Sequence, residues 1–506
     1  MNDSTAGIQV ATTSGVVQGA HQDGLAVFKG VPFAAAPVGD LRWRRAHPHP
    51  GWADVLDATA YGPSAPQPYA EGGDPVLGGH GFPPFDENCL TLNIWTPAAD
   101  TAARPVLIWI HGGGFVSGSG ALPIYSGDTF ARDGDLVVVT VNYRLGPLGF
   151  LYFGSENGGS DTEPGNYWLT DHIVALQWIR DNIAAFGGDP ANITIAGQSG
   201  GAFSTAALAA HPQSSGLFHR AILQSPPLGL PIPALAEARQ ITATYLDIVG
   251  AKDLDELREV PWTRLIQASA EMYVQSMKWG HWRVPHTPVL DNASLTCDPV
   301  ELVLDDAALD IDILIGWTKE EANLVFAVNP MYADTTREQV MARLAESFGD
   351  EATEVYASYQ ARRPGATPQE VLMDLISDEL FAAPAIEVAQ ARAARGRPVW
   401  AYRFDFPSPA FDGRLAAAHC LELPFVFDNF DNWSHAPLVD GIESPARDGL
   451  CAAMHQAWIS FIRTGDPNHA GLPKWQRYTE DRPTTMRFDT VSTTTEVPRE
   501  VSTDKV

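Results

Sequence analysis

The sequence predicts an α/β fold in which a large, mostly parallel sheet is covered by helices on both faces. Short apolar runs rich in Val and Ile recur along the chain, and such runs are typical of strands buried on both faces. Helical patterns lie between the runs, and this alternation favours a doubly covered sheet. The expected core strands are residues 90–95, 106–110, 136–141, 193–196, 221–223, 313–315 and 399–404.

The remaining segments indicate how a single domain of residues 1–506 is organised. Apolar residues at helical spacing predict a helix over 171–186. Residues 62–84 are rich in Gly and Pro and predict a long surface loop. Two helix-rich stretches, roughly 232–304 and 322–395, interrupt the alternation. We expect them to be insertions over the C-terminal edge of the sheet, where open α/β folds bind ligands.

Composition excludes several classes of protein. The 506 residues are 45% hydrophobic and 19% charged, as in a globular protein, and the net charge of −28 argues against a nucleic-acid partner. The N-terminus lacks the basic and apolar regions of a signal peptide, and no run of 18 apolar residues predicts a membrane span. The four cysteines have neither the spacing of a disulfide scaffold nor that of zinc ligands. We therefore expect a cytoplasmic protein without membrane, metal or cofactor; monomer and homodimer remain open.

The segment Gly197-Gln198-Ser199-Gly200-Gly201 fits the G-x-S-x-G nucleophile elbow. An apolar strand-like run precedes it and a small-residue helical segment follows, which is the context that this motif requires. The turn holds a serine hydroxyl out above the sheet, and glycines are needed because a Cβ would collide with neighbouring chain. The pentapeptide alone also occurs by chance, so the hypothesis that Ser199 is a nucleophile depends on partners elsewhere.

A second motif, His111-Gly112-Gly113-Gly114-Phe115, directly follows an expected core strand. It fits the HGGG-type oxyanion motif, in which backbone amides stabilise the anion of a tetrahedral intermediate. We predict the amides of Gly113 and Gly114 as donors, with Gly200 as the third at a helix N-terminus. The alternative is a glycine-rich turn without a partner.

A possible acid and a possible base follow later in the chain. Glu320 and Glu321 come just after the strand 313–315, and His419 precedes the segment 421–427. The order Ser…Glu…His matches the α/β-hydrolase order. Histidine suits a general base because it exchanges a proton near neutral pH. A lone histidine is more often structural, so the prediction rests on the whole set, and spacing does not separate Glu320 from Glu321.

These motifs and others make the chain resemble the type-B carboxylesterase family, which includes bacterial p-nitrobenzyl esterases, animal carboxylesterases and cholinesterases. The resemblance spans nearly the whole chain and is carried further by residues 28–34, 37–43, 87–94, 186–190 and 422–427. It implies an α/β-hydrolase fold and a serine mechanism that cleaves esters of small molecules through an acyl-enzyme. It also implies that Glu321 is the acid, that Ser225 supports it, and that Arg42 pairs with Glu87.

Several positions depart from the family pattern. Gln198 and Gly200 stand where the elbow usually has Glu and Ala, and Cys89 lacks the upstream cysteine with which it would form a disulfide in eukaryotic relatives. The positions of the cholinesterase aromatic cage are Gly79, Leu324 and Val325. Without that cage a choline substrate loses its cation–π attraction.

We therefore expect a hydrolase of neutral, bulky or aromatic carboxylic esters. An amide or carbamate hydrolase with the same residues is the alternative within the class. A non-catalytic binding protein on this fold is the alternative outside it, and it is disfavoured because all three triad residues are present.

Overall fold

The computed structural model describes residues 7–69, 73–79, 81–154, 159, 165–291, 294–304 and 310–496. The N-terminal segment 1–6, residues 70–72 and 80 of the predicted loop, and residues 292–293 of the first predicted insertion lie outside this description.

Across the described ranges, one 13-stranded sheet runs through the molecule in the order β1-β2-β3-β5-β7-β6-β8-β9-β10-β11-β12-β13, with β4 paired to β2. In the sheet order, neighbouring strands from β7 to β12 are parallel. The outer strands pair antiparallel, except that β4 pairs with β2 in parallel. The strands are β1 Ile8–Thr12, β2 Gly15–Gln22, β3 Leu25–Pro32, β4 Leu56–Asp57, β5 Thr91–Thr96, β6 Arg104–Ile110, β7 Val137–Val141, β8 Gly188–Gln198, β9 Arg220–Gln224, β10 Asp312–Thr318, β11 Val399–Phe404, β12 Thr484–Phe488 and β13 Thr493–Glu496.

All seven core strands expected from sequence are confirmed, as β5 to β11. Their apolar runs are buried because the parallel strands have helices on both faces; in β7 every residue is buried. Strands β12 and β13 were not predicted. Their sequences are rich in Thr, and β13 is an exposed edge strand without a continuous apolar run.

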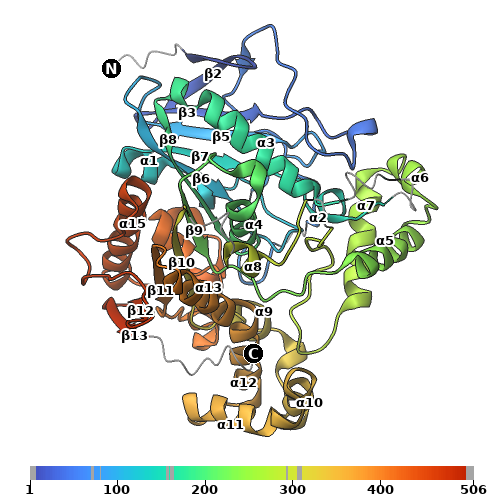
Figure 1. The fold of residues 1–506 in the computed structure, drawn as a ribbon, viewed down its shortest axis with the longest axis vertical. Helices are drawn as coiled ribbons and strands as arrows, with labels where there is room; N and C mark the ends of the chain where they lie inside the picture. Colours follow the sequence, from blue (N-terminus) through green and yellow to red (C-terminus); the bar gives the residue numbers. More distant parts are fainter. Residues whose placement is uncertain are drawn as a thin grey trace.

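Helices form a layer on each face of the sheet (Figure 1). One layer holds α3 Tyr167–Asn182, α4 Gly200–Ala210, α8 Pro299–Leu304 and α13 Ala383–Ala394; the other holds α1 Asp128–Gly134 and α15 Ala446–Thr464. Helix α4 is buried along its whole length because it packs against β8, β9 and α8. The predicted helix 171–186 corresponds to α3 and a following 3₁₀ turn, Ile183–Phe186.

The first predicted insertion contains α5 Leu235–Val249, α6 Leu254–Arg258 and α7 Trp262–Ser276, followed later by α8. Helices α5 and α7 pack together around a separate apolar cluster that includes Tyr245, Leu265 and Met272. This packing gives the segment a core of its own beside the main one.

The second predicted insertion contains α9 Asn323–Phe326, α10 Arg337–Phe348, α11 Ala352–Arg362, α12 Pro368–Ser377 and then α13. Helices α10, α11 and α12 contact one another and project from one end of the molecule (Figure 1). Helix α13 differs from the expectation: it contacts β10 and β11 and so belongs to the layer over the sheet.

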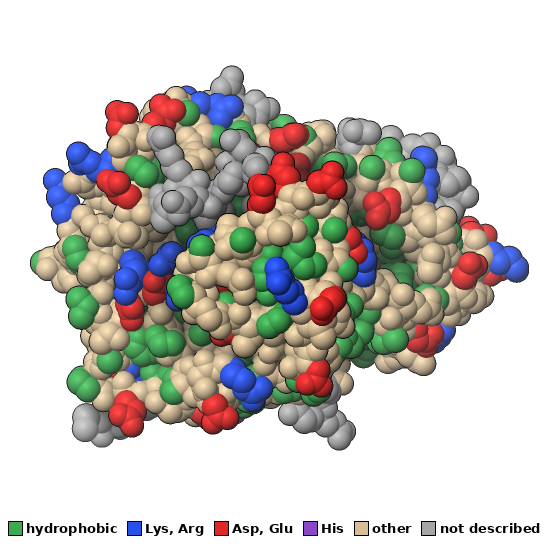
Figure 2. Space-filling view, turned by 90° about the horizontal axis from the view of Figure 1, so that it is seen from below, with side chains coloured by type: hydrophobic (Ala, Val, Ile, Leu, Met, Phe, Trp, Pro, Cys, Tyr) green, Lys and Arg blue, Asp and Glu red, His purple; other side chains and the backbone are tan. Residues whose placement is uncertain are grey.

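The charged side chains on one face of the molecule are mixed in sign. Figure 2 shows Asp and Glu side chains scattered among Lys and Arg on the face seen there, without one large patch of a single sign. This distribution suits a solvated surface. None of the helices in the described part of the chain combines the length and apolar character needed to cross a membrane.

Candidate active site

Ser199 lies at the turn between β8 and α4, with φ 56° and ψ −128°. Two glycines make this turn possible. A Cβ at Gly197 would come 2.4 Å from the Gly201 backbone, and a Cβ at Gly201 would come 2.1 Å from the Ile110 carbonyl oxygen. The serine N–H is held by the Gln224 carbonyl oxygen of β9 at 2.9 Å. The elbow is therefore a strained turn wedged between β6, β8 and β9.

The glycine motif lies against the elbow because β6 and β8 are parallel neighbours. A Cβ at Gly112 would lie 3.1 Å from the Ser199 Cβ, which shows how closely the two turns approach. Gly113 has φ 114° and Gly114 has φ 58°, both in the region that favours glycine. A Cβ at Gly113 would also lie 2.1 Å from the Ser117 carbonyl oxygen.

The N–H groups of Gly113, Gly114 and Gly200 have no acceptor among the described residues, and all three glycines line the same cavity. Gly200 is the first residue of α4, where N–H groups are left without intrahelical partners. Unpaired N–H groups that face a cavity are available to an anion in it.

The structure separates the two glutamates that spacing could not. Glu321 is fully buried, and its carboxylate contacts His419 Nδ1 in a short hydrogen bond and accepts from the Thr318 N–H at 2.7 Å. Glu320 faces away, where it accepts from Arg363 at 3.0 Å and pairs with Lys319. Glu321 is thus the carboxylate placed to orient His419.

The charge of His419 depends on opposing effects. Burial disfavours the imidazolium, but Cys420 and Glu321 favour it, and the net effect raises the pKa of His419 above its usual value. Burial raises the pKa of the Cys420 thiol. The thiol is therefore uncharged at neutral pH and contributes no charge there, so the charge that favours the imidazolium is the Glu321 carboxylate in contact with Nδ1.

The other ring nitrogen of His419 faces the elbow. Its Nε2 lies 3.0 Å from the side-chain nitrogen of Gln198, the residue before the serine. Within the described chain, no hydrogen bond joins the Ser199 hydroxyl to His419. Catalytic hydrogen bonds are often formed only when substrate is bound, so this geometry is compatible with a serine–histidine pair.

Ser225 lies at the end of β9 with φ 46°, and its N–H donates to the Gly316 carbonyl oxygen at 2.8 Å. Its hydroxyl is buried and has no hydrogen-bond partner among the described residues. The structure therefore records no contact by which Ser225 supports Glu321, and that role stays a prediction.

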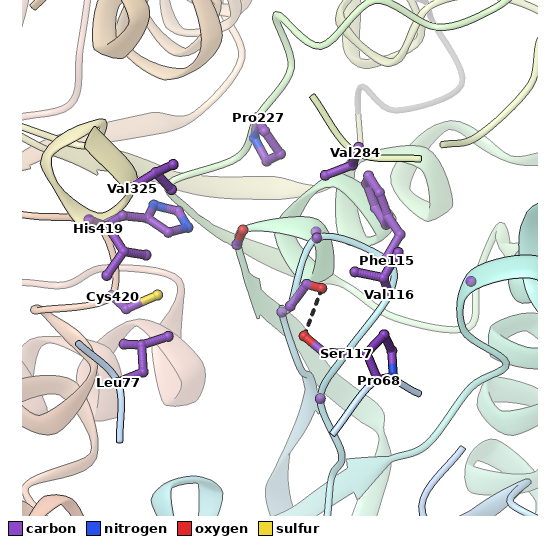
Figure 3. A pocket seen from close by; sticks show the side chains of 18 of the residues that line it. Pro68, Leu77, Phe115, Val116, Ser117, Pro227, Val284, Val325, His419 and Cys420 are labelled. Atoms are coloured by element: carbon purple, nitrogen blue, oxygen red, sulfur yellow. Dashed lines mark hydrogen bonds between the residues drawn. The ribbon is translucent and has the colours of Figure 1, made fainter. Parts of the chain in front are cut away.

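A cavity of about 560 Å³ opens above the elbow. Figure 3 shows His419 and Cys420 on one side of it and Phe115, Val116 and Ser117 on the other. The described residues that line the cavity include no Asp or Glu, and most of them are apolar. Cavities of this size and character commonly hold small organic molecules.

Two wall residues were not found from sequence. Trp282 and Phe381 pack against the His419 ring with centroid separations of 5.6 Å and 5.0 Å. They come from the two predicted insertions. Large aromatic residues in these segments were the available signal, but their position depends on the path of each insertion.

The structure places the residues that depart from the family pattern, and the expected Arg42–Glu87 pair, as follows. Leu324 and Val325 line the cavity, whereas Gly79 is not among its lining residues. Cys89 is a buried free thiol without a disulfide. Arg42 and Glu87 form the expected buried ion pair.

The fold, the strained serine turn and the Glu321–His419 pair together define an α/β-hydrolase. The family model described as "Carboxylesterase family" matches residues 6–505, and the chain belongs to this family.

Proteins of known name are similar to this chain over nearly its full length. The chain is 50% identical over 475 residues to phenmedipham hydrolase of Pseudarthrobacter oxydans, with 94% of each chain covered. It is 36% identical over 495 residues to para-nitrobenzyl esterase of Bacillus subtilis, with 95% of each covered. Among solved structures, Geobacillus stearothermophilus carboxylesterase EST55 matches with TM-score 0.87 and 38% identity, covering 97% of this chain and 98% of that one. The protein is a carboxylic ester hydrolase.

Proposed function

We propose that the protein cleaves esters by a serine mechanism in which Ser199 is the nucleophile, His419 the general base and Glu321 the acid that orients it. The observation that carries the proposal is the buried Glu321–His419 pair at the edge of the cavity to which Ser199 is exposed. With Nδ1–H donated to Glu321, the Nε2 atom carries the lone pair that a general base needs.

The proposed reaction has two halves. Ser199 Oγ attacks the ester carbonyl carbon while His419 Nε2 takes the hydroxyl proton, and the resulting oxyanion accepts from the N–H groups of Gly113, Gly114 and Gly200. Collapse breaks the bond to the alcohol oxygen, which receives the proton from His419. Water then repeats the sequence on the acyl-enzyme and releases the acid.

The cavity supports neutral, bulky or aromatic substrates. Leu324 and Val325 give aliphatic contact, and Trp282 and Phe381 give aromatic surface beside His419. A cationic ester would find no carboxylate among the described lining residues. A carbamate or amide hydrolase remains the second candidate, because the relative with 50% identity is named for hydrolysis of phenmedipham.

A substrate comparison tests this proposal. We expect kcat/KM to be highest for uncharged p-nitrophenyl esters of short to medium acyl length. Butyrylthiocholine should not exceed an uncharged thioester of similar size once high salt has screened the net charge of −28. Phenmedipham and aryl amides in the same assay separate the two candidates. A choline preference that persists at high salt would contradict the substrate class.

The pH dependence tests the role of His419. Because only the neutral imidazole accepts a proton, kcat/KM should rise with pH on one deprotonation and then level off. Glu321 raises the pKa of His419, so the midpoint should lie above the ordinary value of about 6.5, and activity should be lost as pH falls through it. A pH series with one neutral ester measures the midpoint. A midpoint clearly below 6.5 would mean that burial outweighs the carboxylate.

We also infer a cytoplasmic location. The buried free thiol of Cys89 suits a reducing compartment, in which thiols are not oxidised to disulfides. Cell fractionation followed by immunoblotting tests this, and recovery of the protein outside the cytoplasm would overturn it.

A further inference from the structure

The side chain of Gln198 is placed between the nucleophile and the base. It is buried at the end of β8, directly before Ser199, and its amide nitrogen lies 3.0 Å from His419 Nε2. The same nitrogen lies 3.4 Å from Cys420 Sγ. The two N–H bonds of the amide therefore have two partners, both on the loop that carries the base.

The direction of this hydrogen bond follows from the other side of the ring. Glu321 is held by the Thr318 N–H on one oxygen and faces His419 Nδ1 with the other, so Nδ1 carries the proton. In the neutral ring Nε2 is then a lone-pair acceptor. A side-chain NH₂ group can donate to that lone pair, whereas a carboxylate at this position could not.

Of the other titratable groups described around the ring, Cys420, Tyr125 and Tyr402 are uncharged at neutral pH, and Glu422 is partly ionised. Burial and the nearby Glu321 raise the pKa of Glu422 to about 7, and burial raises the pKa of the Cys420 thiol. Burial also raises the pKa values of Tyr125 and Tyr402. Trp282 and Phe381 cover the ring with apolar surface. Glu321 is thus opposed across the ring by a neutral amide.

We propose that Gln198 is a positioning residue that favours the uncharged Nδ1–H form of His419 in the free enzyme. The inference rests on the proposed role of His419 as the base. The amide favours the neutral ring because it donates to a lone pair that the imidazolium lacks. Gln198 therefore offsets the Glu321 carboxylate and extends activity to lower pH. When substrate binds, His419 Nε2 exchanges its hydrogen bond from Gln198 for one from the Ser199 hydroxyl.

The test compares pH profiles of kcat/KM for wild type, Gln198→Glu, Gln198→Met and Gln213→Glu. A carboxylate beside Nε2 favours the imidazolium, so Gln198→Glu should move the acidic midpoint upward by about 1 unit or more. Gln198→Met has similar length but no donor and should move it upward by less. Gln213→Glu makes the same charge change at an exposed site beyond the far end of α4 and should leave the midpoint in place.

A measurement independent of turnover separates this inference from the proposed mechanism. With ¹⁵N-histidine labelling, the His419 ring is titrated by NMR in the Ser199→Ala background, with and without Gln198→Glu. An upward shift of the ring pKa supports the inference even if Ser199→Ala is found to retain activity. Equal kinetic midpoints in Gln198→Glu and Gln213→Glu, or a ring pKa that Gln198→Glu leaves unchanged in the NMR titration, would overturn it. If Gln198→Glu does not fold, a pH midpoint of Gln198→Met equal to that of the wild type would overturn the inference.

Discussion

Replacing Ser199 with Ala is expected to lower kcat by about 10⁶ while leaving the free energy of unfolding nearly unchanged. The loss is large because the elbow, residues 197–201, carries no other hydroxyl group. The fold should persist because the backbone N–H of residue 199 still donates to Gln224 and its carbonyl still begins α4. Steady-state kinetics on a p-nitrophenyl ester and a denaturant titration measure the two quantities.

Ser117→Ala is the matched control, since Ser117 lines the same cavity and donates to the Gly113 carbonyl oxygen at 3.1 Å. Loss of one such hydrogen bond costs about 1 kcal/mol, so kcat should change by less than about tenfold. A sulfonyl fluoride should label Ser199 in the wild type and in Ser117→Ala. Retention of more than a few per cent of activity by purified Ser199→Ala would remove this serine from the mechanism.

Glu321→Gln should lower kcat by roughly 10⁴. The amide removes the negative charge that stabilises the imidazolium formed when Ser199 is deprotonated. Its NH₂ group, if turned toward Nδ1, would also favour the wrong tautomer. Because Glu321 lies against the ring in a fully buried site, no solvent can replace the lost charge. Single-turnover kinetics at a pH on the plateau isolate this effect from the protonation of His419.

The neighbouring variant Glu320→Gln should behave differently. Glu320 is buried and binds Arg363 and Lys319, so we expect a loss of about 1–3 kcal/mol in the free energy of unfolding but less than a tenfold change in kcat. The expected effect is on stability, because the Arg363 contact is lost, and turnover should change little. If instead Glu320→Gln abolished turnover and Glu321→Gln did not, the acid would be the other glutamate.

The core strands and the motifs could be predicted from the sequence because they depend on local burial and local backbone contacts. A central strand such as β6 is covered on both faces, so its run of apolar residues is continuous. Gly197 and Gly201 are required by backbone contacts within a few ångström, and this requirement shows in the sequence as a short motif. The strand–turn–helix context therefore predicted Ser199 and the glycine donors as candidates.

The pocket walls and the contacts around His419 could not be predicted from the sequence in this way. Gln198 and His419 are 221 positions apart, and their contact depends on side-chain orientations that no spacing encodes. Trp282 and Phe381 reach the ring only because of the routes taken by two long helical segments. The choice between Glu320 and Glu321 likewise needed the direction in which each side chain points, since both follow the same strand.

The close approach of Gly201 to the Ile110 carbonyl oxygen joins the serine turn to β6, the strand that leads into the glycine motif. The nucleophile and the predicted oxyanion donors therefore belong to one rigid block, whereas Trp282 and Phe381 are attached to separate segments. Substitutions in those segments can change the cavity wall without altering the contacts of Gly201 with Ile110 and of Gly112 with Ser199. Under laboratory selection for a new ester, we therefore expect the first useful changes in the enclosing segments, and the block itself to tolerate almost none.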